Sequence, residues 1–108
     1  MIARHWTGLA YHDRADDYER FLRTRTFPEI KAIAGFLGGS ILRAEKDDGI
    51  AFRVITEWVS LEAVRGFAGD EVEQAVIPED VLEMLARYDR SVTHYEVRHR
   101  VGEGPQGR

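Results

Sequence analysis

The spacing of apolar and polar positions in the first third of the chain predicts a strand followed by a helix. Residues 2–9 look like an opening strand. In residues 15–26 apolar side chains recur at helical spacing, and acidic residues in the first turns suit the positive end of the helix dipole. Pro28 is expected to bend or restart this helix because its ring excludes a regular helical hydrogen bond, and Gly35 is expected to end it.

An antiparallel hairpin is the clearest local prediction. Residues 36–44 and residues 50–58 have the composition of two strands. The segment Lys46-Asp47-Asp48-Gly49 joins them, and its Asp-Gly pair is typical of a hairpin turn.

Shorter helices are predicted after the hairpin. Ser60 is placed to cap a helix, and Gly69 is placed to close it. Leu61, Val64 and Phe67 form its apolar face. Asp70 and Glu73 have the spacing of a capping box, which predicts a further helical turn.

The last part of the chain predicts a third short helix and a final strand. Pro78 suits the first position of that helix. Val81, Leu82 and Leu85 form its apolar side. Residues that favour β-structure cluster in residues 91–101, and residues 102–108 form a polar, Gly-rich tail that we expect to be mobile.

The predicted order of elements is strand, helix, strand, strand, helices, strand. This is the βαββαβ pattern of a ferredoxin-like α+β fold, an antiparallel sheet with its helices on one face. A chain of 108 residues has the length of a single domain. We therefore expect one domain over residues 1–101, followed by the tail.

The faces of the predicted hairpin strands favour a homodimer. One face of residues 50–58 carries Phe52, Val54, Thr56 and Trp58, and the other carries Ala51, Arg53, Ile55 and Glu57. Simple alternation places Phe36 and Leu42 on one face of the preceding strand and Leu37 and Ile41 on the other. A half-solvated strand alternates cleanly, which these do not, so the second face needs a cover that a symmetric partner can supply. The alternative is that isolated apolar side chains are simply common on surfaces.

Composition excludes several functional classes. The net charge of −4 builds no field that would attract nucleic acid or anionic lipid. The chain has no cysteine, so disulfides, thiolate metal sites and cysteine nucleophiles are excluded. No signal peptide is apparent at the start, and no apolar run is long enough to span a bilayer. The cytoplasm is the expected location.

The segment Trp58-Val59-Ser60-Leu61-Glu62-Ala63-Val64-Arg65-Gly66-Phe67 resembles the W-x-S-x-E-A-x-x-x-F segment of the antibiotic biosynthesis monooxygenase superfamily. The opening Ile2-Ala3-Arg4-His5-Trp6 and the late Val92-Thr93-His94-Tyr95-Glu96-Val97 also look like strands of its small, uncharacterised bacterial members. The resemblance covers nearly the whole chain except the tail. It implies a homodimeric α/β barrel.

The activity that the resemblance implies is less specific, because one fold supports many functions. The superfamily includes cofactor-independent oxygenases of phenols and quinols, haem-degrading enzymes and proteins without a known reaction. We therefore expect a cofactor-independent monooxygenase that acts on a small aromatic substrate of the phenol or hydroquinone type. A non-catalytic small-molecule binder or accessory dimer, and an isomerase or cyclase, remain alternatives.

Five residues are candidates for the site. Trp6, Trp58 and Phe67 could line a flat pocket for an aromatic substrate, or could simply belong to the core. His94 could remove a phenolic proton, and Arg4 could stabilise the resulting anion. The alternative for both is an ordinary strand residue.

We expect neither a cofactor nor a metal. Haem degradation in the superfamily is associated with an Asn on the first strand and with a Trp and a His around the second helix. This chain has His5, Phe67 and Val76-Ile77 in those regions, which argues against haem breakdown. His94 and His99 lie on opposite sides of a strand and make a poor metal pair.

Overall fold

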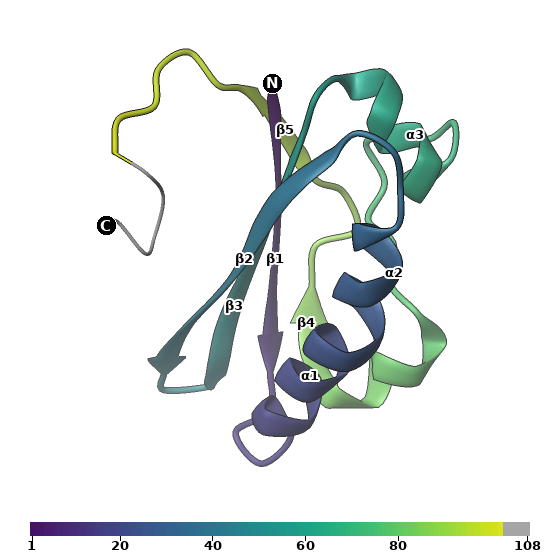
Figure 1. Cartoon of the computed structure of the whole chain (residues 1–108). Coiled ribbons are helices and arrows are strands. Elements are labelled where there is room, and N and C mark those ends of the chain that lie inside the picture. Colours follow the sequence, from purple (N-terminus) through teal and green to yellow (C-terminus); the bar gives the residue numbers. More distant parts are fainter. Residues whose placement is uncertain (103–108) are drawn as a thin grey trace.

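A computed structural model describes residues 1–102 and contains one antiparallel sheet whose helices all lie on one face (Figure 1). The strands are β1 (Ile2–Ala10), β2 (Phe36–Lys46), β3 (Gly49–Trp58), β4 (Leu85–Tyr88) and β5 (Thr93–Glu96). They are ordered β2-β3-β1-β4, and β5 also pairs with β1. The predicted ferredoxin-like fold is confirmed. The predicted tail lies, from residue 103 on, outside the described residues.

The first helical segment changes its helical type next to Pro28, where a bend or restart was predicted. It consists of α1 (Ala15–Phe21), the π-helical turn η1 (Leu22–Thr26) and α2 (Phe27–Lys31). Pro28 sits in the first turn of α2, where its missing N–H is tolerated, and the helix widens into the π turn just before it. Gly35 has a φ of 92° in the turn that leads to β2.

Of the later helices, only the first has the predicted length. Ser60 caps α3 (Leu61–Ala68) by accepting a hydrogen bond from the Ala63 N–H, as expected. The predicted helical turn from Asp70 to Glu73 is absent, and that prediction was wrong. Its backbone finds partners across space instead, since the Val92 N–H donates to the Glu73 carbonyl at 2.8 Å. The third helix is the 3₁₀ segment η2 (Glu79–Met84).

The edge of the sheet beside β1 is shared by two short strands. β4 pairs with Gly8–Ala10, and β5 pairs with Ile2–His5. The final strand predicted over residues 91–101 is present as the shorter β5, but β4 was not predicted, and the assignment of Leu85 to a helix was wrong. Leu85 begins β4 because its extended backbone can pair with β1 while its side chain remains buried.

A β-bulge corrects the predicted faces of β2. Phe36 pairs with Trp58, but Gly38 pairs with Glu57, so β2 has one extra residue here. The alternation of side chains between the two faces of β2 therefore shifts by one position. Ile41 therefore packs against the core, and Leu42 is 48% exposed on the opposite face. Simple alternation had placed Phe36 and Leu42 together. The predicted faces of β3 are confirmed.

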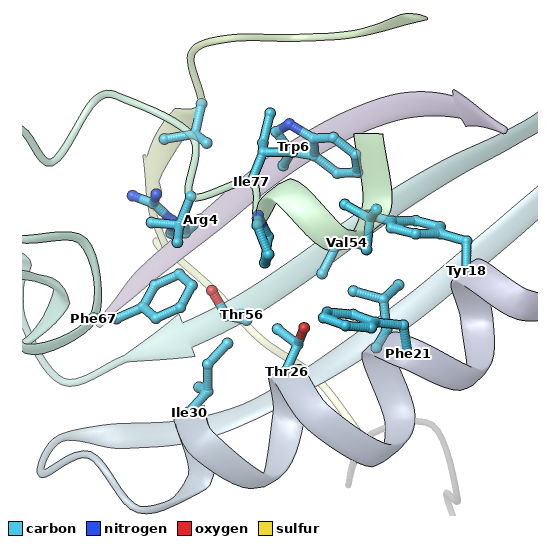
Figure 2. Close-up of a pocket in the computed structure, with 15 residues that line it drawn as sticks. Arg4, Trp6, Tyr18, Phe21, Thr26, Ile30, Val54, Thr56, Phe67 and Ile77 are labelled. Atoms are coloured by element: carbon cyan, nitrogen blue, oxygen red, sulfur yellow. The ribbon is translucent and has the colours of Figure 1, made fainter. Parts of the chain in front are cut away.

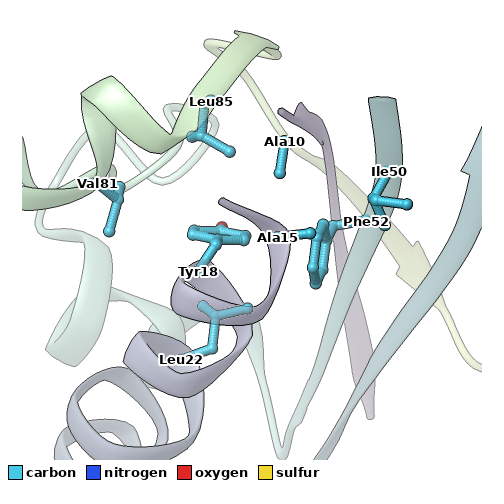
Figure 3. Packing of buried hydrophobic residues seen from close by; sticks show 8 residues of the cluster. All are labelled: Ala10, Ala15, Tyr18, Leu22, Ile50, Phe52, Val81 and Leu85. Atoms are coloured by element: carbon cyan, nitrogen blue, oxygen red, sulfur yellow. The ribbon is translucent and has the colours of Figure 1, made fainter. Parts of the chain in front are cut away.

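The core consists of two clusters on the helix side of the sheet. The larger one contains Ala10, Ala15, Tyr18, Leu22, Ile50, Phe52, Val81 and Leu85 (Figure 3). The smaller one contains Ile30, Trp58, Val64 and Val72. None of the helices in residues 1–102 is long and apolar enough to cross a membrane.

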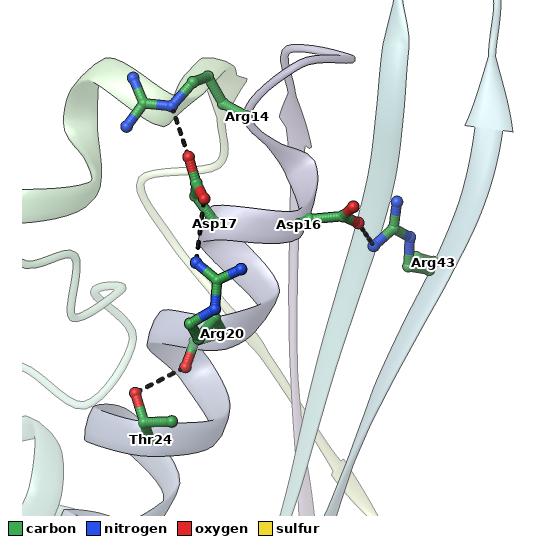
Figure 4. A network of polar contacts seen from close by, with 6 residues as sticks. All are labelled: Arg14, Asp16, Asp17, Arg20, Thr24 and Arg43. Carbon is green, nitrogen blue, oxygen red and sulfur yellow. Dashed lines mark hydrogen bonds and ion pairs between the residues drawn. The ribbon is translucent and has the colours of Figure 1, made fainter.

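Ion pairs at the surface attach α1 to the edge strand β2. Arg43 lies 3.0 Å from Asp16, and Asp17 sits between Arg14 and Arg20 at 3.1 Å from each (Figure 4). Arg43 also lies 2.8 Å from Glu19. Exposed pairs of this kind contribute less than about 1 kcal/mol each. They help to fix the helix over the sheet without deciding the fold.

Candidate functional site

A cavity of about 60 Å³ lies between the sheet and the helices, where the two core clusters meet (Figure 2). The sheet contributes Arg4, Trp6, Val54 and Thr56; the helical segment contributes Tyr18, Phe21, Leu22, Thr26 and Ile30. Phe67 and residues from the segments around Ile77, Val81 and Val92 complete the wall. The lining is mostly apolar and aromatic, which is typical of small-molecule sites.

Arg4 is the one charged side chain in this lining. It is only 4% exposed. Its Nη1 donates to the Val72 carbonyl at 2.6 Å, and its Nη2 donates to the Gln74 carbonyl at 2.9 Å. The guanidinium lies 5.7 Å from the centre of the Phe67 ring. Arg4 therefore fastens the segment after α3 to β1 and also faces the cavity.

No carboxylate within residues 1–102 forms an ion pair with Arg4. Burial lowers the pKa of Arg4 to about 10, against an opposing effect of nearby Glu73, so the side chain stays charged at neutral pH. Buried charges in proteins are usually paired. A guanidinium held by two carbonyls and a neutral imidazole leaves a positive potential at the cavity wall.

His94 stands behind Arg4 and does not line the cavity. Its Nε2 lies 3.0 Å from Arg4 Nη1. Arginine can only donate, so Nε2 must accept and the proton of the neutral ring is on Nδ1. Burial and the charge of Arg4 lower the pKa of His94. The structure thus brings the two predicted catalytic residues together, with only Arg4 at the cavity surface.

The three predicted aromatic residues occupy different places. Trp6 lines the cavity, and its Nε1 donates to the Asp89 carbonyl at 2.8 Å. Phe67 also lines it. Trp58 does not: it is fully buried and stacks behind Phe67, with ring centres 6.3 Å apart.

Thr56 is a site residue that the sequence analysis did not single out. It is 4% exposed, lines the cavity and pairs in register with Arg4 across β1 and β3. Its Oγ1 accepts a hydrogen bond of 2.9 Å from Trp58 Nε1. A threonine on the predicted apolar face of residues 50–58 was the signal that could have identified it.

The lining does not fit a haem. It offers no histidine, cysteine or methionine to an iron atom, and the one histidine nearby uses Nε2 to hold Arg4. With about 60 Å³ of free space, a porphyrin would have to displace much of the wall. Within residues 1–102, no three His, Cys, Asp or Glu side chains are grouped so that they could hold a metal ion.

Comparison with family models found none that matches this chain, and a search of curated proteins found no match either. Solved structures do match. A mutant of MhuD with manganese protoporphyrin IX bound is 20% identical, with a TM-score of 0.68 over 95% of this chain and 100% of that one. The haem-degrader MhuD from Mycobacterium tuberculosis is 21% identical, with a TM-score of 0.63 over 94% and 100%.

A third match is a protein from Deinococcus radiodurans that is proposed to be an antibiotic biosynthesis monooxygenase. It is 19% identical, with a TM-score of 0.66 over 95% of this chain and 98% of that one. At these identities the likeness shows a shared fold. The α+β fold implied by the resemblance in the sequence is thereby confirmed, and the dimer stays a prediction.

Proposed function

We propose that this protein is a cofactor-independent monooxygenase of the antibiotic biosynthesis type, acting on a small aromatic substrate with a phenolic or hydroquinone oxygen. The observation that carries the proposal is the buried Arg4 guanidinium, which faces an apolar, aromatic cavity without a carboxylate partner among residues 1–102. Two of the matching structures come from proteins proposed to be such monooxygenases.

A buried cation favours the ionised form of a phenol placed beside it. The phenolate would hold its charge next to Arg4, while Trp6 and Phe67 contact the ring. The phenolic proton passes to solvent, and a C–H ring carbon of the anion forms a bond to O₂ to give a hydroperoxide. Loss of water from the hydroperoxide leaves a carbonyl at that carbon, so the substrate supplies all four electrons that reduce O₂ and no cofactor is needed. His94 keeps the guanidinium in place by accepting a hydrogen bond from Nη1. In this arrangement Arg4 acts on the substrate, and His94 acts through Arg4.

The cavity of about 60 Å³ leaves little free space, so a ligand of two or three fused rings must displace part of the wall. Val76, Ile77 and Pro78 form the part that can yield most easily, because they belong to neither a helix nor a strand and Val76 and Pro78 are exposed. The sheet and α1 are fixed by backbone hydrogen bonds. Substrate therefore enters beside this segment.

We also infer a homodimer that covers the face of the sheet opposite the helices (Figure 1). That face carries the exposed Leu37, Leu42 and Tyr95 and the half-buried Ile55. No helix among the described residues covers it. A second copy related by a two-fold axis would bury these side chains with the same surface on both chains.

Oxygen consumption by the chelator-treated protein tests the reaction. The substrates are a panel of anthrones and naphthalene hydroquinones, and the variants are Trp6→Ala, His94→Ala and their combination. His99→Ala is the matched control, because His99 is exposed and just beyond β5. We expect uptake by the wild-type and control proteins and a loss of at least tenfold in the combined variant. Equal rates in all five proteins, or no uptake above the buffer rate with any substrate, would refute the proposal.

A non-catalytic binder is the second candidate. It is favoured by the lining itself, in which no side chain with a pKa near neutrality faces the cavity. It predicts binding of aromatic ligands to the same cavity without oxygen uptake.

A further inference from the structure

Three polar residues form a row across the sheet beneath the cavity. Arg4 in β1 pairs with His94 of β5 on one side and with Thr56 of β3 on the other. Directly paired residues on antiparallel strands have Cβ atoms about 5 Å apart on the same face. Both Arg4 and Thr56 are 4% exposed and line the cavity, and Figure 2 shows them on the same strand layer beside Phe67.

The direction of the Thr56 hydroxyl is determined by Trp58. The indole N–H can only donate, and it donates to Thr56 Oγ1 at 2.9 Å. The hydroxyl proton of Thr56 has no acceptor within residues 1–102. Its remaining role toward the cavity is therefore mainly that of a donor.

Arg4, next to Thr56, has N–H groups that donate to no described residue. A guanidinium carries five N–H groups, and the described residues accept three of them, through the carbonyls of Val72 and Gln74 and through His94 Nε2. One Nη2 N–H and the Nε N–H are left. Glu73 is close enough to raise the pKa of Arg4, but among the described residues it forms no ion pair with Arg4.

We propose that Arg4 and Thr56 form a subsite for an anionic oxygen of a planar aromatic ligand, and that Trp58 is its positioning residue. The subsite presents mostly donors, beside a fixed positive charge and a single free lone pair on Thr56 Oγ1, so it favours a carboxylate or phenolate oxygen over groups that must donate, such as an amide NH₂ or an ammonium. Hydrogen bonds to a charged acceptor are stronger than those to a neutral one, so the subsite binds an anionic oxygen more tightly than a neutral one. This subsite rests on the proposed function only in that it uses the same cavity.

Calorimetric titration tests the subsite with three probes of nearly equal shape: 1-naphthoate, 1-naphthamide and 1-naphthylmethylamine. We expect the wild-type protein to bind the naphthoate at least tenfold more tightly than the other two. Thr56→Val keeps the shape and removes the hydroxyl, and should weaken naphthoate binding by about 5- to 30-fold while changing naphthamide binding less than twofold. Thr56→Ser should restore the preference. Thr93→Val is the control, since Thr93 is exposed on β5.

Trp58→Phe tests the positioning role. Without the indole N–H, both lone pairs of the Thr56 hydroxyl are free to accept, so the preference for naphthoate over naphthamide should shrink while the folded protein still binds both. A merely structural role of Trp58 would weaken both probes equally. If Trp58→Phe does not fold, Thr56→Val and Thr56→Ser decide the question alone.

The outcomes separate this subsite from the proposed reaction. Selective loss of naphthoate binding in Thr56→Val without any oxygen uptake by the wild-type protein supports the subsite and refutes the reaction. Oxygen uptake with equal binding of naphthoate and naphthamide refutes the subsite and keeps the reaction. Failure of the folded wild-type protein to bind any probe at millimolar concentration also refutes the subsite.

Discussion

Arg4 and His94 face each other across β1 and β5, with Arg4 Nη1 3.0 Å from His94 Nε2. Because the guanidinium has no lone pair to offer, this contact exists only while the imidazole is neutral. A histidine that could have been a free proton acceptor is thereby tied to a positively charged neighbour. The pairing links the pH at which His94 takes up a proton to the stability of the cavity wall.

The pKa of His94 is expected below its ordinary value of 6.5, which NMR titration of the ring protons can measure. As the pH falls below 6.5, the unfolded chain binds this proton first, so the free energy of unfolding decreases between pH 6.5 and the lower pKa of the folded state. His94→Gln should flatten that decrease. His5 also has a lowered pKa and acts in the same direction, so the comparison is made in a His5→Gln background. A pKa of His94 at or above 6.5 would contradict the neutral pairing.

Tyr18→Phe is expected to leave the stability unchanged or to raise it by up to about 1 kcal/mol. Tyr18 is buried, burial raises the pKa of its hydroxyl, and this hydroxyl has no hydrogen-bond partner within residues 1–102. Its ring packs edge-on against Phe52, a contact that phenylalanine keeps. Urea unfolding measures the change. A loss of more than about 1 kcal/mol would show that the hydroxyl has a partner that stabilises the fold.

Gly8→Ala should displace the ring of Trp6. A Cβ at Gly8 would lie 2.5 Å from Trp6 Cη2, closer than any real contact. We expect a loss of about 1–3 kcal/mol in unfolding free energy and a shift of tryptophan fluorescence. Gly38→Ala is the matched control on β2, because the nearest atom to its Cβ would be 3.9 Å away. Equal effects of the two substitutions would mean that Trp6 does not depend on the space above Gly8.

Leu42→Glu should convert the inferred dimer into a monomer of 12.4 kDa in sedimentation equilibrium. A charge placed on a buried, self-complementary face costs the association far more than it costs the folded chain. Leu82→Glu is the control, because Leu82 is similarly exposed, at 40% against 48%, but belongs to η2 on the helix side. A wild-type protein that sediments as a monomer, or dimers that survive Leu42→Glu, would contradict this assignment of the interface.

The sequence predicted those helices and strands that are specified by residues within the element itself or in the adjoining turn. The hairpin between β2 and β3, the cap at Ser60 and the opening strand all follow from turn chemistry, capping and alternation, which act over a few residues. The order of these elements was enough to predict the ferredoxin-like fold.

The predictions of secondary structure and strand faces were wrong where hydrogen bonding to a segment distant in the chain outweighed the local conformational preference. Residues 70–77 have the composition of a helix start, but their backbone hydrogen-bonds with residues 90–92. The bulge between Phe36 and Gly38 exchanges the faces of Ile41 and Leu42, because one extra residue reverses a period of two. Neither effect is visible from residue spacing.

The sequence by itself determined the set of strands and helices, their order and the residue types available for chemistry, Arg4, Trp6 and His94 among them. Only the tertiary structure decided which of these meet. It placed Trp58 in the core, His94 behind Arg4, and Thr56 beside Arg4 at the cavity. The physical reason is that strand register and burial are set by pairing between segments far apart in the chain, whereas residue spacing reports only on neighbours.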